Sequence, residues 1–127
     1  MKKIELITNV YPNWKPSDIA FIKTVEWSTS NIMMIVYCQL RGDGGGWPDM
    51  SNDFFEVILM FSNVSHFRLD FTAKGVQQIS GCDILDVSGN GLENINYQIE
   101  DYENDIINFS CEEIEVIEVS TPFKIGI

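Results

Sequence analysis

The side chains best suited to chemistry are carboxylates, and they gather in the second half of the chain. Eleven Asp and Glu residues lie between positions 75 and 123, where there is no Lys or Arg. Asp101, Glu103 and Asp105 alternate within five residues, and paired carboxylates are what glycoside hydrolysis requires. A general acid also needs burial to raise its pKa, whereas these three fall in an expected turn. We therefore predict a binding protein, and no enzyme.

Oxygen-bearing side chains also occur in the glycine-rich stretch from Asp43 to Asp53, and such oxygens are ligands that calcium accepts. The stretch lacks the spacing of an EF-hand loop, and Gly42–Gly46 lacks the Lys-Ser/Thr pair of a phosphate-binding loop. We expect a solvated loop here. No cofactor and no metal ion is predicted.

Nucleophilic and metal-ligating residues are few. His66 is the only histidine, and no nucleophile or orienting acid is placed to form a triad with it. The three cysteines, Cys38, Cys82 and Cys111, are far apart and lie in apolar stretches. Such spacing favours three reduced, buried thiols over a metal site.

The overall charge narrows the class of partner. The formal net charge is −11, which disfavours nucleic acid and anionic membrane surfaces because both are bound through Lys and Arg. Positions 1–6 contain no apolar run of the kind found in signal peptides, and the longest apolar run, Ile32–Cys38, is far shorter than the ~20 residues of a membrane span. We expect a cytoplasmic protein.

Alternating polar and apolar residues predict strands throughout, and no window shows a helical period. The fold class we predict is all-β: a single domain, 1–127, forming an antiparallel β-sandwich or open barrel of about eight strands. Ser17 or Asp18, after Pro16, is expected to cap one helical turn. The predicted strands span 4–10, 19–27, 32–40, 54–61, 64–71, 79–87, 92–101, 107–111 and 114–119.

The strands 32–40 and 54–61 are apolar on both alternating faces, which predicts a position in the middle of a sheet or under another layer. Trp27 falls on the same predicted strand face as Phe21 and Val25 and is expected in the core. Trp14 and Trp47 lie in loops, where an indole either closes the end of a sandwich or stacks on a sugar or a partner.

Turn residues predict how neighbouring strands connect. Ser62-Asn63 is expected to form a hairpin between the strands on either side of it. For the hairpin around Asn104, a three-residue loop with Asn104 or Asp105 left-handed pairs apolar with apolar side chains, Ile99 with Phe109 and Tyr97 with Cys111. An outward polar face then follows, made of Gln98, Glu100, Asn108 and Ser110.

The alternation breaks at Val116-Ile117. This break predicts either a β-bulge or a strand that is covered on both sides.

Several segments together carry a resemblance to a known family. They are Trp47-Pro48, Phe55-Glu56-Val57-Ile58-Leu59-Met60-Phe61, Val64 with Phe67-Arg68-Leu69, Ser80-Gly81-Cys82-Asp83-Ile84-Leu85-Asp86, Asn96-Tyr97-Gln98-Ile99-Glu100-Asp101-Tyr102-Glu103 and Phe109-Ser110-Cys111-Glu112. The chain from Trp47 to Val119 resembles the small β-rich immunity proteins of bacterial polymorphic toxin systems, most nearly the group called immunity protein 50. The resemblance implies a cytoplasmic antitoxin that binds and neutralises one cognate toxin domain, and it supplies no catalytic residues.

We therefore expect an acidic contact surface for a toxin domain, in which the acids steer association and Tyr102 becomes a buried anchor. Two alternatives stay open: a carbohydrate-binding β-sandwich that uses Trp14 or Trp47, with calcium near Asp43, and a small β-barrel that holds an apolar ligand between its sheets. The sequence indicates neither the toxin nor an oligomeric state. The predicted partner-binding residues are Glu100, Asp101, Tyr102, Glu103, Asp105 and Asn108.

Overall fold

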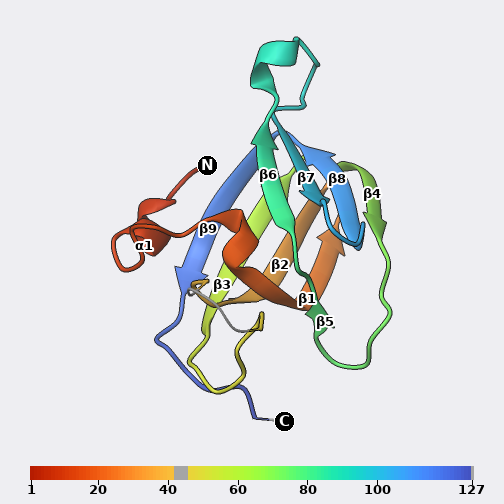
Figure 1. Ribbon diagram of the computed structural model, residues 1–127. Coiled ribbons are helices and arrows are strands. Elements are labelled where there is room, and N and C mark those ends of the chain that lie inside the picture. Colours follow the sequence, from red (N-terminus) through yellow and green to blue (C-terminus); the bar gives the residue numbers. More distant parts are fainter. Residues whose placement is uncertain (42–45, 127) are drawn as a thin grey trace.

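Two antiparallel β-sheets pack face to face in the computed structural model, which describes residues 1–41 and 46–126 (Figure 1). One sheet has five strands in the order β5-β1-β2-β3-β9, and the other has four in the order β4-β8-β7-β6. The predicted all-β antiparallel sandwich is confirmed. The strands are β1 (Ile19–Ser28), β2 (Asn31–Cys38), β3 (Phe55–Ser62), β4 (Ser65–Leu69), β5 (Gln77–Gln78), β6 (Cys82–Asp86), β7 (Tyr97–Asp101), β8 (Ile107–Cys111) and β9 (Glu113–Val119).

The main core lies between the two sheets, where alternate residues of each strand are buried. β2 and β3 occupy the centre of the larger sheet, as their apolar sequences predict. Only one face of these two strands is fully buried, however, because their other face points away from the smaller sheet and is half-buried. The predicted position in the middle of a sheet is therefore confirmed, with the outward face half-buried.

The two sheets are joined at a corner, which replaces the predicted Ser62-Asn63 hairpin. β3 pairs with β9 and β4 pairs with β8, so that one long two-stranded ribbon bends from the larger sheet into the smaller one. At the bend, the Glu112 N–H donates to the Ser62 carbonyl (2.9 Å) and the Asn63 side-chain amide donates to the Glu112 carboxylate (2.8 Å). Asn63 has a φ of 51°, and asparagine tolerates this left-handed conformation.

The N-terminal segment is helical, whereas a strand was predicted for residues 4–10. The helix α1 (Glu5–Thr8) is followed by a 3-10 turn, η1 (Pro16–Asp18). Ile4, Ile7 and Tyr11 all pack against the core, and their spacing of three and four residues places them on one face of a helix. No helix in the described part of the chain is long and apolar enough to cross a membrane.

The predicted helical turn near Asp18 exists, and Asp18, its last residue, takes part in capping its start. The Asp18 carboxylate accepts the backbone N–H of Lys15 at 2.9 Å. A second 3-10 turn, η2, spans Ser88–Asn90.

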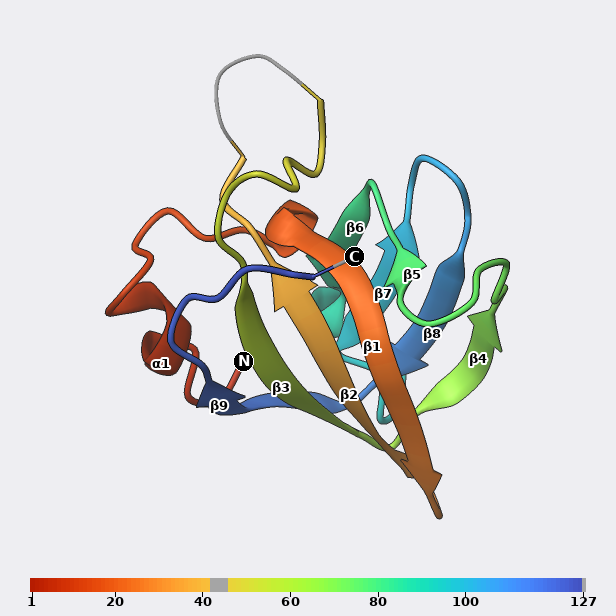
Figure 2. The ribbon, with the colours of Figure 1, turned by 90° about the horizontal axis from the view of Figure 1, so that it is seen from below.

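Trp27 lies outside the core, contrary to prediction, with 76% of its surface exposed. The irregularity in the β1–β2 register between Ile22 and Thr24 moves Phe21 to the opposite face from Val25. Figure 2 shows that the end of the β1–β2 hairpin extends past the four-stranded sheet. Trp27, close to this end, therefore has no opposing sheet to pack against.

The predicted bulge in β9 is confirmed. The register with β3 shifts between the pairs Ile58–Glu118 and Leu59–Val116, which leaves Ile117 without an opposite residue.

All three cysteines are free and buried, as predicted. Burial raises the pKa of each thiol, and that of Cys111 reaches about 12. The thiols are therefore expected to react slowly in the folded protein.

From the geometry of the corner between the sheets, we predict that replacing two different asparagines by alanine lowers the free energy of unfolding by different amounts. Asn63→Ala should lower the free energy of unfolding by about 2 kcal/mol. Alanine tolerates the left-handed conformation less well than asparagine does, and it cannot donate the hydrogen bond to Glu112. Asn94, which has a φ of 59°, serves as the matched control, and Asn94→Ala should cost only about 1 kcal/mol. Urea denaturation measures both, and equal losses would contradict the role assigned to the Asn63–Glu112 bond.

Candidate functional site

The predicted β7–β8 hairpin has the predicted register. Ile99 lies opposite Phe109, Tyr97 opposite Cys111 and Glu100 opposite Asn108. Asp105 has a φ of 55°, so it is the left-handed residue of the turn. This register places alternate residues of β7 and β8 on the outer face of the four-stranded sheet.

Asp101 does not belong to that outer face, and its prediction as a contact residue is corrected here. It lies opposite the buried Cys82 and is only 3% exposed. Its carboxylate accepts the backbone N–H groups of Glu103 (3.1 Å), Asn104 (3.3 Å) and Ile106 (3.2 Å). A carboxylate at the end of a strand satisfies the turn donors in this way, so Asp101 holds the hairpin loop in place.

Two other predicted contact residues are already engaged. Asp105 is exposed and pairs with the Arg68 guanidinium, which approaches it from the neighbouring strand β4. Asn108 accepts the Gln98 amide at 2.7 Å, and Gln98 in turn accepts the Ser110 hydroxyl at 2.6 Å. Ser110 is only 7% exposed. The side chains of Gln98, Asn108 and Ser110 therefore satisfy one another by hydrogen bonds, and we call these three residues the polar floor of the outer face.

Tyr102 and Glu103 lie over Gly81, the residue before β6. A Cβ atom at Gly81 would come within 2.8 Å of Glu103 Cγ and 3.0 Å of Tyr102 Cε2. Because Gly81 has no side chain, the side chains of Tyr102 and Glu103 both fit against it. Tyr102 stays 61% exposed, and its N–H donates to the Gly81 carbonyl at 2.9 Å. An exposed tyrosine with a fixed backbone is suited to bury its ring against a partner.

Asp83 joins this group through the pairing of β6 with β7, which places it directly opposite Glu100. We call Asp83, Glu100, Tyr102 and Glu103 the acidic hairpin face. Within the described part of the chain, none of its three acids takes part in a salt bridge. Like charges directly opposite on two strands destabilise a sheet, so a cation bound here would relieve an existing repulsion.

The sequence alone did not place Asp83 beside Glu100. The ten residues between β6 and β7 leave the register of these strands undetermined, because a long connection does not determine pairing as a short hairpin does. The position of Asp83 between the apolar residues Cys82 and Ile84 was the only local signal.

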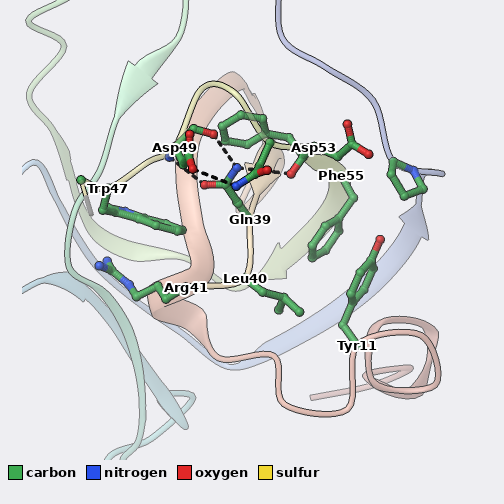
Figure 3. Close-up of a pocket in the computed structure, with 12 residues that line it drawn as sticks. Tyr11, Gln39, Leu40, Arg41, Trp47, Asp49, Asp53 and Phe55 are labelled. Carbon is green, nitrogen blue, oxygen red and sulfur yellow. Dashed lines mark hydrogen bonds between the residues drawn. The ribbon is translucent and has the colours of Figure 1, made fainter. Parts of the chain in front are cut away.

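A pocket of about 440 Å³ lies where the loops of the larger sheet meet the N-terminal segment (Figure 3). The Tyr11 and Phe55 rings stack in its wall with centroids 3.9 Å apart. Burial, followed by the charge of Asp53, raises the pKa of Tyr11. The volume of this pocket is within the range of small-molecule sites.

Several polar groups of this pocket are already bonded to the protein, whereas the buried Nε1 of Trp47 has no hydrogen-bond partner among the described residues. Gln39 exchanges two hydrogen bonds of 2.8 Å with the backbone of Asp49 (Figure 3). Hydrogen bonds from Ser51 lower the pKa of the Asp49 carboxyl, and Asp53 pairs with Lys124 at 3.1 Å. The pocket therefore presents few free groups with which to orient a ligand.

The loop tryptophans have different environments. Trp14 is 9% exposed and belongs to the main core, so it closes the sandwich, which is one of the two roles predicted for it. Trp47 is half-buried, and the Arg41 guanidinium lies 4.1 Å from the centre of its ring. Arg41 therefore occupies one of the two ring faces on which a sugar would stack.

The remaining candidates from the sequence contribute no further site. His66 is exposed, as predicted. In residues 1–41 and 46–126, no three His, Cys, Asp or Glu side chains are grouped to hold a metal ion. Asp43 lies outside the described residues, so the calcium alternative at this position stays a prediction. The cavity between the sheets measures only about 10 Å³, which gives an apolar passenger ligand no room.

Comparison with known proteins assigns no function to this surface. The chain matches no family model, no curated protein and no solved structure. The resemblance to immunity proteins therefore stays a prediction.

The buried carboxylate of Asp101 predicts a large effect on stability. Asp101→Ala should lower the free energy of unfolding by about 3 kcal/mol, because three turn N–H groups lose a charged acceptor. Glu103→Ala, at the exposed position two residues later, should change it by less than about 0.5 kcal/mol. Chemical denaturation of both variants checks this, and a stable Asp101→Ala protein would return Asp101 to the list of contact residues.

Proposed function

We propose that the protein is a non-enzymatic immunity protein that binds and neutralises a cognate toxin domain through the acidic hairpin face. The observation that carries the proposal is the opposed pair Asp83 and Glu100, next to the exposed Tyr102 and Glu103. Such a surface favours a partner that brings positive charge, and enzymes that act on nucleic acid present positive charge to phosphate groups.

Each part of this face has a physical role in the proposal. The three acids attract a basic surface during diffusion, which raises the rate of association and sets the orientation. Tyr102 supplies an aromatic ring that loses its remaining exposure when the partner docks. Asp101 and the polar floor of Gln98, Asn108 and Ser110 hold the hairpin in one conformation, which reduces the entropy lost on binding.

The alternatives receive less support from the geometry. Carbohydrate binding through Trp14 or Trp47 needs an open ring face, but Trp14 is buried and Arg41 covers one face of Trp47. A ligand-carrying barrel needs a cavity of ligand size, and the space between the sheets is far smaller than that.

The proposal predicts protection of a host cell and a charge-dependent association rate. Where the gene directly upstream of this chain encodes a large secreted protein, the C-terminal domain of that protein is the toxin to test. Co-expression with the chain should restore growth to cells that produce this domain. In stopped-flow measurements at low salt, the double variant Glu100→Lys and Glu103→Lys should associate about tenfold more slowly or worse. In about 1 M salt, where charges are screened beyond about 3 Å, most of the difference should disappear.

The matched control reverses two exposed acids elsewhere, Glu5→Lys and Glu93→Lys, with the same change in net charge. This control should associate at nearly the wild-type rate. If both double variants slow association equally, net charge and not the acidic hairpin face is responsible. If the wild-type chain neither binds nor protects, the immunity function itself is wrong.

A further inference from the structure

A second surface, on the opposite side of the sandwich, has the composition of a protein interface. Met33 lies opposite Met60, and Ile35 lies opposite Ile58, in adjacent rows across β2 and β3. All four side chains point to the outer face of the five-stranded sheet and are half-buried. We call these four residues the methionine–isoleucine patch.

The rest of the described protein leaves this patch without a covering layer. Its four residues belong neither to the core between the sheets nor to the second cluster around Ala20, Phe21 and Phe54. The C-terminal segment covers the other end of the same face, where Phe123 packs against Tyr37 with ring centroids 5.2 Å apart. Figure 2 shows this segment crossing one end of β1 and β2 while the remainder of the outer face stays uncovered.

Acidic residues border the patch on both sides. In one row Glu26 of β1 lies opposite Met33, and Glu115 of β9 lies opposite Met60. In the next row Glu118 lies opposite Ile58. Lys3 pairs with Glu115 at 3.6 Å, whereas Glu26 and Glu118 are exposed and form no salt bridge within the described residues. Three strand spacings separate Glu26 from Glu115, about 14 Å.

The charge pattern selects the kind of occupant. A central apolar area with a polar rim is the usual anatomy of a protein interface. A second copy of this chain would bring like-charged rims together, and each copy carries a net charge of −11, so self-association is disfavoured. A segment with an apolar centre and Lys or Arg at both ends would bury the apolar area and pair with the acidic rim at the same time.

We infer that the methionine–isoleucine patch is a docking surface for a basic amphipathic segment of a protein partner. This surface is separate from the acidic hairpin face, because the two lie on the outer faces of different sheets. The protein can therefore hold a basic partner on each side. The inference does not depend on the immunity function, since it specifies only the chemistry of the docked segment.

The methionines make the test direct. The full-length protein is labelled with carbon-13 in its methionine methyl groups, and a peptide with a central apolar face of Leu and two Lys at each end is titrated in. The Met33 and Met60 methyl signals should shift with the peptide concentration. The Met34 signal should not, because Met34 is 4% exposed and faces the core.

Two control peptides and one matched pair of variants define the contact. Peptides with Glu in place of Lys, or Ser in place of Leu, should leave the Met33 and Met60 signals unchanged. Met60→Glu should weaken binding of the Lys-Leu peptide about tenfold or more. Leu85→Glu adds the same charge to the outer face of the other sheet, where Leu85 is exposed, and should not weaken it. Thermal melting establishes that both variants fold, and Ile35→Ala with Ile58→Ala, which keeps both methionine signals, replaces the charged variant if it does not.

The inference is overturned if the Lys-Leu peptide binds without shifting the Met33 and Met60 signals, or if the Ser-containing peptide binds as well, since charge alone would then explain binding. It is also overturned in favour of a second copy if the Met33 and Met60 signals move with protein concentration in the absence of peptide and sedimentation shows a dimer.

Discussion

The structure depends on the corner at which one two-stranded ribbon turns from the larger sheet into the smaller one. β3 and β9 form one half of this ribbon, and β4 and β8 form the other. The bend brings Phe61 and Phe109 edge to face with centroids 5.0 Å apart in the core between the sheets. The hydrogen bonds between Ser62, Asn63 and Glu112 satisfy backbone and side-chain groups where the pairing is interrupted. The remaining strands pair within one of these two sheets, and the corner sets how the two sheets lie relative to each other.

The corner also decides that the two outer faces point in opposite directions and meet different surroundings. The smaller sheet presents a polar floor and the acidic hairpin face, where Asp83 opposes Glu100. The larger sheet presents the methionine–isoleucine patch with acids at its margins. A protein that only needed to fold would gain little from opposed carboxylates or from an uncovered apolar area. Both features motivate the proposed role in binding other proteins.

The parts of the structure that could be predicted from sequence are those governed by neighbouring residues. The β7–β8 register followed from matching Ile99 with Phe109 across a short loop, and the Ile117 bulge followed from a break in alternation. The failures come from contacts between distant segments. Trp27 has the sequence context of a core residue, but it lies where the β1–β2 hairpin extends past the other sheet. Asp101 lies in a sequence typical of an exposed turn, but its buried carboxylate accepts three backbone N–H groups.

The sequence by itself determined the strand period, the antiparallel all-β class, the burial of the cysteines and the concentration of acid in the second half of the chain. These properties follow from local alternation and composition. Only the tertiary structure decided which acids lie together on one outer face, because Asp83 reaches Glu100 through a pairing across a long connection. It likewise decided which apolar face of β2 and β3 stays uncovered, since the two faces have similar side chains and only the position of the second sheet distinguishes them.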